Sequence, residues 1–88
     1  MTLGEGFSAE FLDLRLFVEV KDEGISAAVY DKLSRRWAWQ EFVSTFDEGK
    51  ETALQIAWHD QVRSGKSEQQ VTEARNQVTW VALDSAQE

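Results

Sequence analysis

Apolar and polar residues alternate along residues 11–21, and this is the clearest pattern in the chain. Aliphatic residues take every second position, with charged or aromatic residues between them: Leu12, Leu14, Leu16, Val18 and Val20 against Asp13, Arg15, Phe17, Glu19 and Lys21. Because successive side chains of a β-strand point to opposite faces of its sheet, this period predicts a strand with one buried face. Gly24 follows soon after, and glycine supplies the positive φ that a tight hairpin needs.

Two further strands are predicted downstream, over 25–32 and over 36–46, with a turn at 33–35 between them. The later segment is rich in aromatic and β-branched residues, which suit a pleated, half-buried surface. The three strands together form an antiparallel meander.

The predicted pairing gives this meander two hydrophobic faces. Turns at 23–24 and at 32–35 place Val18 opposite Val29 on the aliphatic face. The opposite face receives the aromatic residues Phe17, Tyr30, Trp37 and Trp39. A shift of the third strand by one residue would exchange its two faces, because the side-chain period of a strand is two.

Helical spacing replaces the alternation after the third strand. Thr45 with Glu48 fits a capping box, and Asp47 is an alternative N-cap. Apolar residues then recur at intervals of three and four as far as Arg63, which is one stripe of an amphipathic helix. Gly65 is a suitable residue for the position just beyond the helix end.

A second helix is predicted over 67–83, where Ser67 with Gln70 forms another capping box. The alternative for 77–83 is a fourth strand, because Val-Thr-Trp-Val at 78–81 suits β structure equally well. The absence of Gly and Pro from 67–83 favours the helix.

The order of elements predicts an α+β fold, with a three-stranded antiparallel β-meander followed by two helices. The chain of 88 residues is expected to form a single domain. Its ends, 1–10 and 85–88, show no periodicity and are expected to be flexible.

The passage 46–54 places an acidic helix cap before an Ala-Leu helix, directly after the predicted meander. In this order of elements, 11–63 resembles small bacterial β-β-β-α domains of the HicB-like antitoxin fold. The Pro-Asp-Leu-Pro-Gly-Cys-type passage of HicB-like domains is missing, since the chain has no Pro and no Cys. The resemblance therefore implies the fold and carries no function.

The charge balance restricts the classes of partner. Sixteen acidic and nine basic residues give a net charge of −7, whereas duplex nucleic-acid binding and binding to anionic membranes depend on basic residues. No apolar run approaches the roughly 20 residues of a membrane helix. No signal peptide is expected, because the first residues show no basic region followed by an apolar one. A cytoplasmic protein without disulfides or thiolate metal sites is expected.

Catalytic chemistry has little support in the sequence. His59 is the single histidine, and no nucleophile or orienting carboxylate accompanies it in a recognisable pattern. The acids at 47, 48 and 51 are explained by the positive end of a helix dipole. The sequence contains neither the regularly spaced acidic residues of a calcium-binding loop nor the glycine-rich motif of a phosphate-binding loop. The sequence therefore predicts no enzyme, no cofactor and no metal site.

The aromatic face is the candidate binding site, because Trp, Tyr and Arg are the usual anchors of protein interfaces. A basic cluster at 32–36 flanks it. The candidate partner-binding residues are Phe17, Tyr30, Arg35, Arg36, Trp37 and Trp39. The structural alternative is that the C-terminal segment covers this face. The predicted function is a small acidic interaction or regulatory module that binds a protein partner or a second copy. An acidic nucleic-acid mimic, of the kind phage-encoded inhibitors use, and an antitoxin-like regulator are the alternatives.

Overall fold

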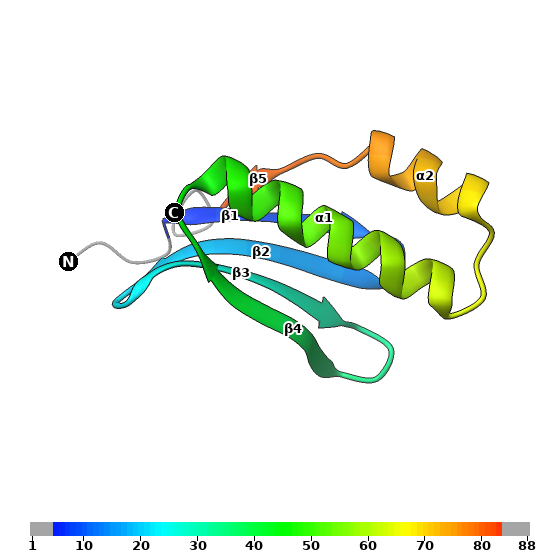
Figure 1. Cartoon of the computed structure of the whole chain (residues 1–88), viewed down its shortest axis with the longest axis horizontal. Helices are drawn as coiled ribbons and strands as arrows, with labels where there is room; N and C mark the ends of the chain where they lie inside the picture. The colour runs from blue at the N-terminus through cyan, green and yellow to red at the C-terminus, as the bar shows by residue number, and fades with distance from the viewer. Residues whose placement is uncertain (1–4, 84–88) are drawn as a thin grey trace.

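One antiparallel sheet carries two helices on one of its faces in the computed structural model, which describes residues 5–83 (Figure 1). The described part of the chain forms an α+β fold with five strands and two helices: β1 Gly6–Phe11, β2 Leu14–Lys21, β3 Gly24–Asp31, β4 Arg36–Val43, α1 Phe46–Arg63, α2 Glu68–Asn76 and β5 Val81–Ala82. The strands lie in the order β4-β3-β2-β1-β5. The predicted meander is therefore the β2-β3-β4 part of a wider sheet.

The predicted first strand over 11–21 is in fact parts of two strands. Leu12 and Asp13 form a two-residue turn, and Phe11 pairs with Leu14 across it. Leu12 has a φ of 54°, a left-handed conformation that non-glycine residues seldom adopt. Because no Gly or Asn marks this turn, the alternation conceals it. Residues 6–10, which show no periodicity in the sequence, form most of β1 and pair with β2 and β5.

The meander forms as predicted, but its register differs. The β2–β3 turn uses Asp22 and Glu23, so Val18 pairs with Ala27 instead of Val29. The register of β2 against β3 is thus shifted by two residues, which leaves every side chain of these two strands on its predicted face. The predicted pairing of Tyr30 with Trp37 is confirmed.

A β-bulge in β4 changes the predicted faces. Tyr30 pairs with Trp37, whereas its neighbour Val29 pairs with Trp39, so Ala38 is an extra residue in β4. From Trp39 onward the alternation of β4 is therefore out of phase with its beginning. Trp39 consequently packs against the hydrophobic core, on the side of the sheet that faces α1.

Both predicted helix starts are confirmed by their caps. The Thr45 hydroxyl accepts a hydrogen bond from the Glu48 backbone N–H at 3.1 Å, and the Ser67 hydroxyl accepts one from the Gln70 N–H at 3.1 Å. α1 ends at Arg63 as predicted, and Gly65 follows with a φ of 113°.

The second helix is shorter than predicted. α2 ends at Asn76, so the prediction of a helix over all of 67–83 is wrong. The alternative of a strand over 77–83 is right in part, because Val81 pairs with Ser8 and Ala82 with Phe7 to form β5. The tail 85–88, predicted to be flexible, lies outside the described residues.

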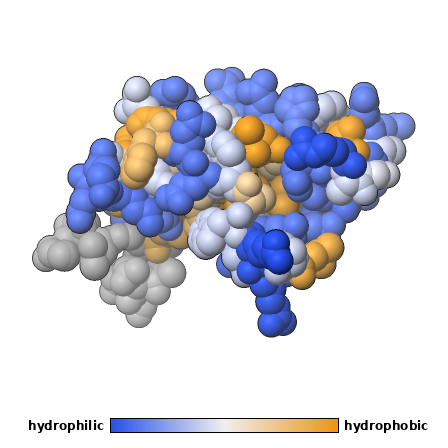
Figure 2. Space-filling view, turned by 60° about the horizontal axis from the view of Figure 1, so that its bottom comes forward, coloured by the Kyte–Doolittle hydropathy of each residue, from blue (hydrophilic) through white to orange (hydrophobic). Residues whose placement is uncertain are grey.

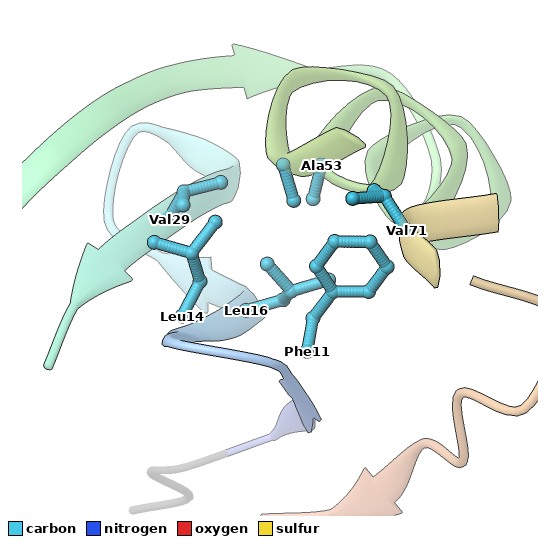
Figure 3. Close-up of a cluster of buried hydrophobic side chains, with 7 residues drawn as sticks. Phe11, Leu14, Leu16, Val29, Ala53 and Val71 are labelled. Atoms are coloured by element: carbon cyan, nitrogen blue, oxygen red, sulfur yellow. The ribbon is translucent and has the colours of Figure 1, made fainter. Parts of the chain in front are cut away.

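The core lies between the sheet and the helices. Figure 3 shows side chains of β1, β2 and β3 pointing toward α1 and α2; the buried set is Phe11, Leu14, Leu16, Val29, Ala53, Ala57 and Val71. Alanines on the inner stripe of α1 bring the helix close to the sheet. At Gly49 the helix and the sheet are in close contact, since an added Cβ would lie 2.8 Å from Val18 Cγ1. The helix start therefore requires glycine for packing.

Neither helix in the described part of the chain combines the length and the apolar character needed to cross a membrane.

Candidate functional site

The face of the sheet that points away from α1 and α2 has no other element of the described chain lying on it (Figure 1). Strand alternation assigns thirteen side chains to this surface, here named the open face: Ser8, Glu10, Arg15, Phe17, Glu19, Lys21, Ser26, Ala28, Tyr30, Trp37, Gln40, Phe42 and Val81. Figure 2 brings the underside of Figure 1 forward and shows hydrophobic and hydrophilic side chains intermixed.

Three rings form an aromatic cluster that spans β2, β3 and β4 on the open face. Trp37 of β4 contacts Phe17 of β2, with ring centroids 5.5 Å apart, and Tyr30 of β3, at 5.0 Å. Trp37 is still 58% exposed, whereas the other two rings are partly buried. The cluster is thus ordered by its own ring contacts and keeps one large ring available for contact.

Two shallow clefts flank Trp37. The larger, of about 350 Å³, is lined by Arg15, Phe17, Tyr30, Lys32 and Trp37. The smaller, of about 190 Å³, lies on the other side and is lined by Phe17, Glu19, Lys21, Ser26, Ala28, Trp37 and Gln40. Gln40 donates a hydrogen bond to the Ser26 hydroxyl at 3.1 Å, which satisfies that buried polar group. Both clefts therefore share the rings of Phe17 and Trp37 as a common wall.

The ionic groups beside the larger cleft form a three-residue cluster. Glu10 of β1 pairs across the strands with Arg15 of β2, and its carboxylate accepts a hydrogen bond from Arg15 Nε at 2.6 Å. Lys32, just beyond β3, donates to the other oxygen of Glu10. The hydrogen bond from Lys32 chiefly, and then that from Arg15, lower the pKa of Glu10, against a partial opposing effect of burial.

The open face carries little net charge compared with the rest of the chain. Its charged side chains, together with Lys32, are three bases and two acids, and each acid is paired with a base. Glu19 forms an ion pair with Lys21 at an N–O distance of 3.2 Å. The surface is thus close to neutral, at +1, in a chain of −7. The remaining residues consequently carry −8.

The structure brings three of the predicted site residues together and separates the others from them. Phe17, Tyr30 and Trp37 form the aromatic cluster, as the alternation predicts. The prediction that Trp39 belongs to this face is wrong, because the bulge turns its side chain toward the core. Residues 67–83 do not cover the open face, since α2 packs by Val71 on the opposite side and β5 extends the sheet beside β1.

The predicted basic frame of the site is also different. Arg36 pairs with Asp31, which in turn pairs with the core residue Leu14, so Arg36 projects on the α1 side of the sheet. Arg35 lies in the β3–β4 turn with a φ of 60°. Arg15 and Lys32 flank the rings instead. The sequence held a signal for Arg15, because it alternates in phase with Phe17.

His59 is exposed on α1. Its ring lies nearly perpendicular to that of Trp58, with the ring centroids 5.2 Å apart. Within residues 5–83 no group of three or more His, Asp or Glu side chains is placed to hold a metal ion.

Comparisons of the chain with models of protein families, with curated proteins and with solved structures find no match. The resemblance of 11–63 to HicB-like domains stays a prediction. The function of the chain has to be inferred from the open face.

Proposed function

We propose that this chain is a non-catalytic protein-interaction module that binds a protein partner through the aromatic cluster of the open face. The observation that carries the proposal is the placement of Phe17, Tyr30 and Trp37 on a sheet face that the described chain leaves uncovered. Burial of exposed aromatic surface supplies much of the binding free energy at protein interfaces, and a few such residues dominate it.

Preorganisation of the cluster supports this role. Trp37 is held between Phe17 and Tyr30, so little side-chain entropy remains to be lost when a partner covers it. The ion pairs of the face are formed within the face itself, and a partner therefore need not supply charges to neutralise each of them. Both features lower the cost of bringing a second protein against the sheet.

The larger cleft indicates the chemistry of the contacting segment. It combines three rings with Arg15 and Lys32, whose two positive charges share the single carboxylate of Glu10. The three side chains therefore carry a net charge of +1 at the edge of an apolar cleft. A segment with an apolar or aromatic anchor residue beside one carboxylate would complement it.

Selection from a random peptide display library against the immobilised chain tests the proposal. We expect enrichment of peptides with an apolar anchor next to an acidic residue, and at least tenfold weaker binding of a selected peptide to Trp37→Ala. Val20→Ala is the matched control, because Val20 is a 44% exposed apolar residue on the other face of the sheet.

The result that would overturn the proposal is a library without enrichment, or peptides that bind Trp37→Ala as tightly as the wild type. Equal weakening by Val20→Ala would also contradict it, because surface hydrophobicity in general would then explain the binding.

The acidic nucleic-acid mimic remains the second candidate, supported by the −8 carried outside the open face. It predicts binding to a basic DNA-binding nuclease that weakens steeply with added salt and is unaffected by Trp37→Ala. Binding that does not respond to salt would contradict this alternative.

A further inference from the structure

The outer edge of β4 is the second surface of interest. Within residues 5–83 the sheet ends at this strand, which is eight residues long and exposed at six of them. An edge strand presents a row of N–H and C=O groups on which another strand can pair. Short length, Lys or Pro usually protects such edges, and β5 at the opposite edge has only two residues. β4 contains no Lys and no Pro, and the protective features it has are its bulge and the charged residues Arg36 and Glu41.

Two charged residues of β4 share the α1 side of the sheet. Arg36 pairs with Asp31 and Glu41 with Ala27, and both of those β3 residues alternate in phase with Val29 of the core. Arg36 and Glu41 have numbers of opposite parity, so a regular strand would place them on opposite faces. The extra residue Ala38 is what brings them onto one face.

Neither of these charges has an ion-pair partner within residues 5–83, although most other bases of the chain do. Arg36 and Glu41 cannot pair with each other in one chain, because five residues of extended strand separate them by about 16 Å. An antiparallel copy of the same strand brings one against the other.

We propose that a second copy of this chain pairs antiparallel with β4, so that Arg36 lies opposite Glu41 of the second copy. The two-fold axis then falls between Ala38 and Trp39, and the ion pair forms twice. Trp37 lies opposite Gln40 of the second copy and diagonal to Phe42 of the second copy, within reach of an aromatic side chain. The exposed rings of Trp37 and Phe42, 58% and 49% exposed, are thereby partly covered.

Charge disfavours one alternative register that also keeps the faces of the regular part of β4 matched. That alternative is centred on Glu41, with Trp39 opposite Val43 and Gln40 opposite Phe42. It places Glu41 directly against Glu41 of the second copy, and like charges at opposed positions destabilise a sheet. The register with Arg36 opposite Glu41 replaces this repulsion with two attractions.

The dimer would be an extension of the sheet across two copies. A two-fold axis perpendicular to a sheet reverses strand direction and preserves its faces, so both open faces lie on one side and both α1 helices on the other. The rings of Phe17 and Tyr30 stay uncovered. Trp37 belongs to both surfaces, so a second copy would cover part of the proposed partner site. The dimer itself is argued from Arg36 and Glu41 and does not depend on the proposed function.

Sedimentation equilibrium over rising protein concentration tests the dimer, and charge reversal tests its register. We expect the wild type to approach twice the monomer mass. Arg36→Glu and Glu41→Arg should each weaken self-association about tenfold or more, because each converts both ion pairs into repulsions. An equimolar mixture of the two variants should restore a heterodimer, since their charges are then complementary. Arg35→Glu is the matched control and should behave as the wild type, because Arg35 lies in the turn.

A wild type that stays monomeric up to about millimolar concentration would overturn the proposal. So would a dimer that neither reversal weakens, or a mixture that does not associate. Amide hydrogen exchange of the wild type alone gives a second readout that needs no variant to fold. Protection that rises with concentration in β4 supports the pairing, and protection that rises elsewhere or nowhere contradicts it.

Discussion

The two faces of the sheet are built from the same strands, yet they differ in nearly every physical respect. On the covered face, Leu14, Leu16 and Val18 are fully buried, and the two leucines pack in one cluster with Ala53 and Ala57 of α1. On the open face, the neighbouring side chains are aromatic or ion-paired, and they remain accessible. Leu16 and Phe17 are adjacent in sequence, but their side chains point to opposite faces of the sheet. One strand therefore provides stability on one side and a surface for recognition on the other.

Leu16→Ala and Phe17→Ala probe this difference most directly. Leu16 is fully buried, so its truncation should lower the free energy of unfolding by about 2–5 kcal/mol through lost burial and an unfilled cavity. Phe17→Ala should cost about 1 kcal/mol, mainly through its ring contact with Trp37. Urea denaturation measures both. Equal losses would mean that the open face is part of a second core.

The Trp37 and Trp39 pair tests the bulge. Trp39 packs against the core, so Trp39→Ala should destabilise by about 2–4 kcal/mol, whereas Trp37→Ala should cost about 1 kcal/mol or less. Thermal unfolding followed by far-ultraviolet circular dichroism distinguishes them. A reversed order would show that Trp39 lies on the open face and that β4 has no bulge at Ala38.

Gly49→Ala tests how closely the covered face approaches α1. Alanine favours a helix by about 1 kcal/mol over glycine. Here, however, its Cβ would lie 2.8 Å from Val18 Cγ1 and 3.1 Å from Val43 Cγ2. Overpacking should outweigh the gain and lower the free energy of unfolding by about 1–2 kcal/mol. A more stable variant in urea denaturation would contradict this close contact.

Glu10 provides the smallest effect, and it belongs to the open face. The pKa of Glu10 is lowered in the folded state. Its contribution to the free energy of unfolding is therefore complete above its ordinary pKa of 4.5, and it is lost as the pH falls through the lower pKa of the folded state. Wild type and Glu10→Gln should differ by about 0.5 kcal/mol at pH 7, a small amount because the pair is half-exposed. Urea denaturation at pH 7 and pH 3 should show this difference shrinking. A difference that grows toward pH 3 would contradict the lowered pKa of Glu10 in the folded state.

Local signals were sufficient wherever one short segment decides the structure. The caps at Thr45 and Ser67 each depend on a residue three positions away, and both were predictable. The alternation of β2 correctly placed Phe17 opposite the aliphatic face. The turn at Leu12 and Asp13 escaped prediction, because Leu12 and not Gly or Asn takes its positive-φ position. A contact from far along the chain also fixes it, since Lys66 Nζ donates a hydrogen bond to the Asp13 carboxylate at 2.6 Å.

The sequence by itself determined which segments have a buried face, where the helices begin and that Phe17, Tyr30 and Trp37 share a surface. These outcomes follow from periods of two and 3.6 residues, which any short window contains. The tertiary structure alone decided that Trp39 turns inward, that Arg15 and Lys32 flank the rings, and that β1 and β5 complete the sheet. Each of these depends on contacts between distant segments, whose free energy no local pattern records.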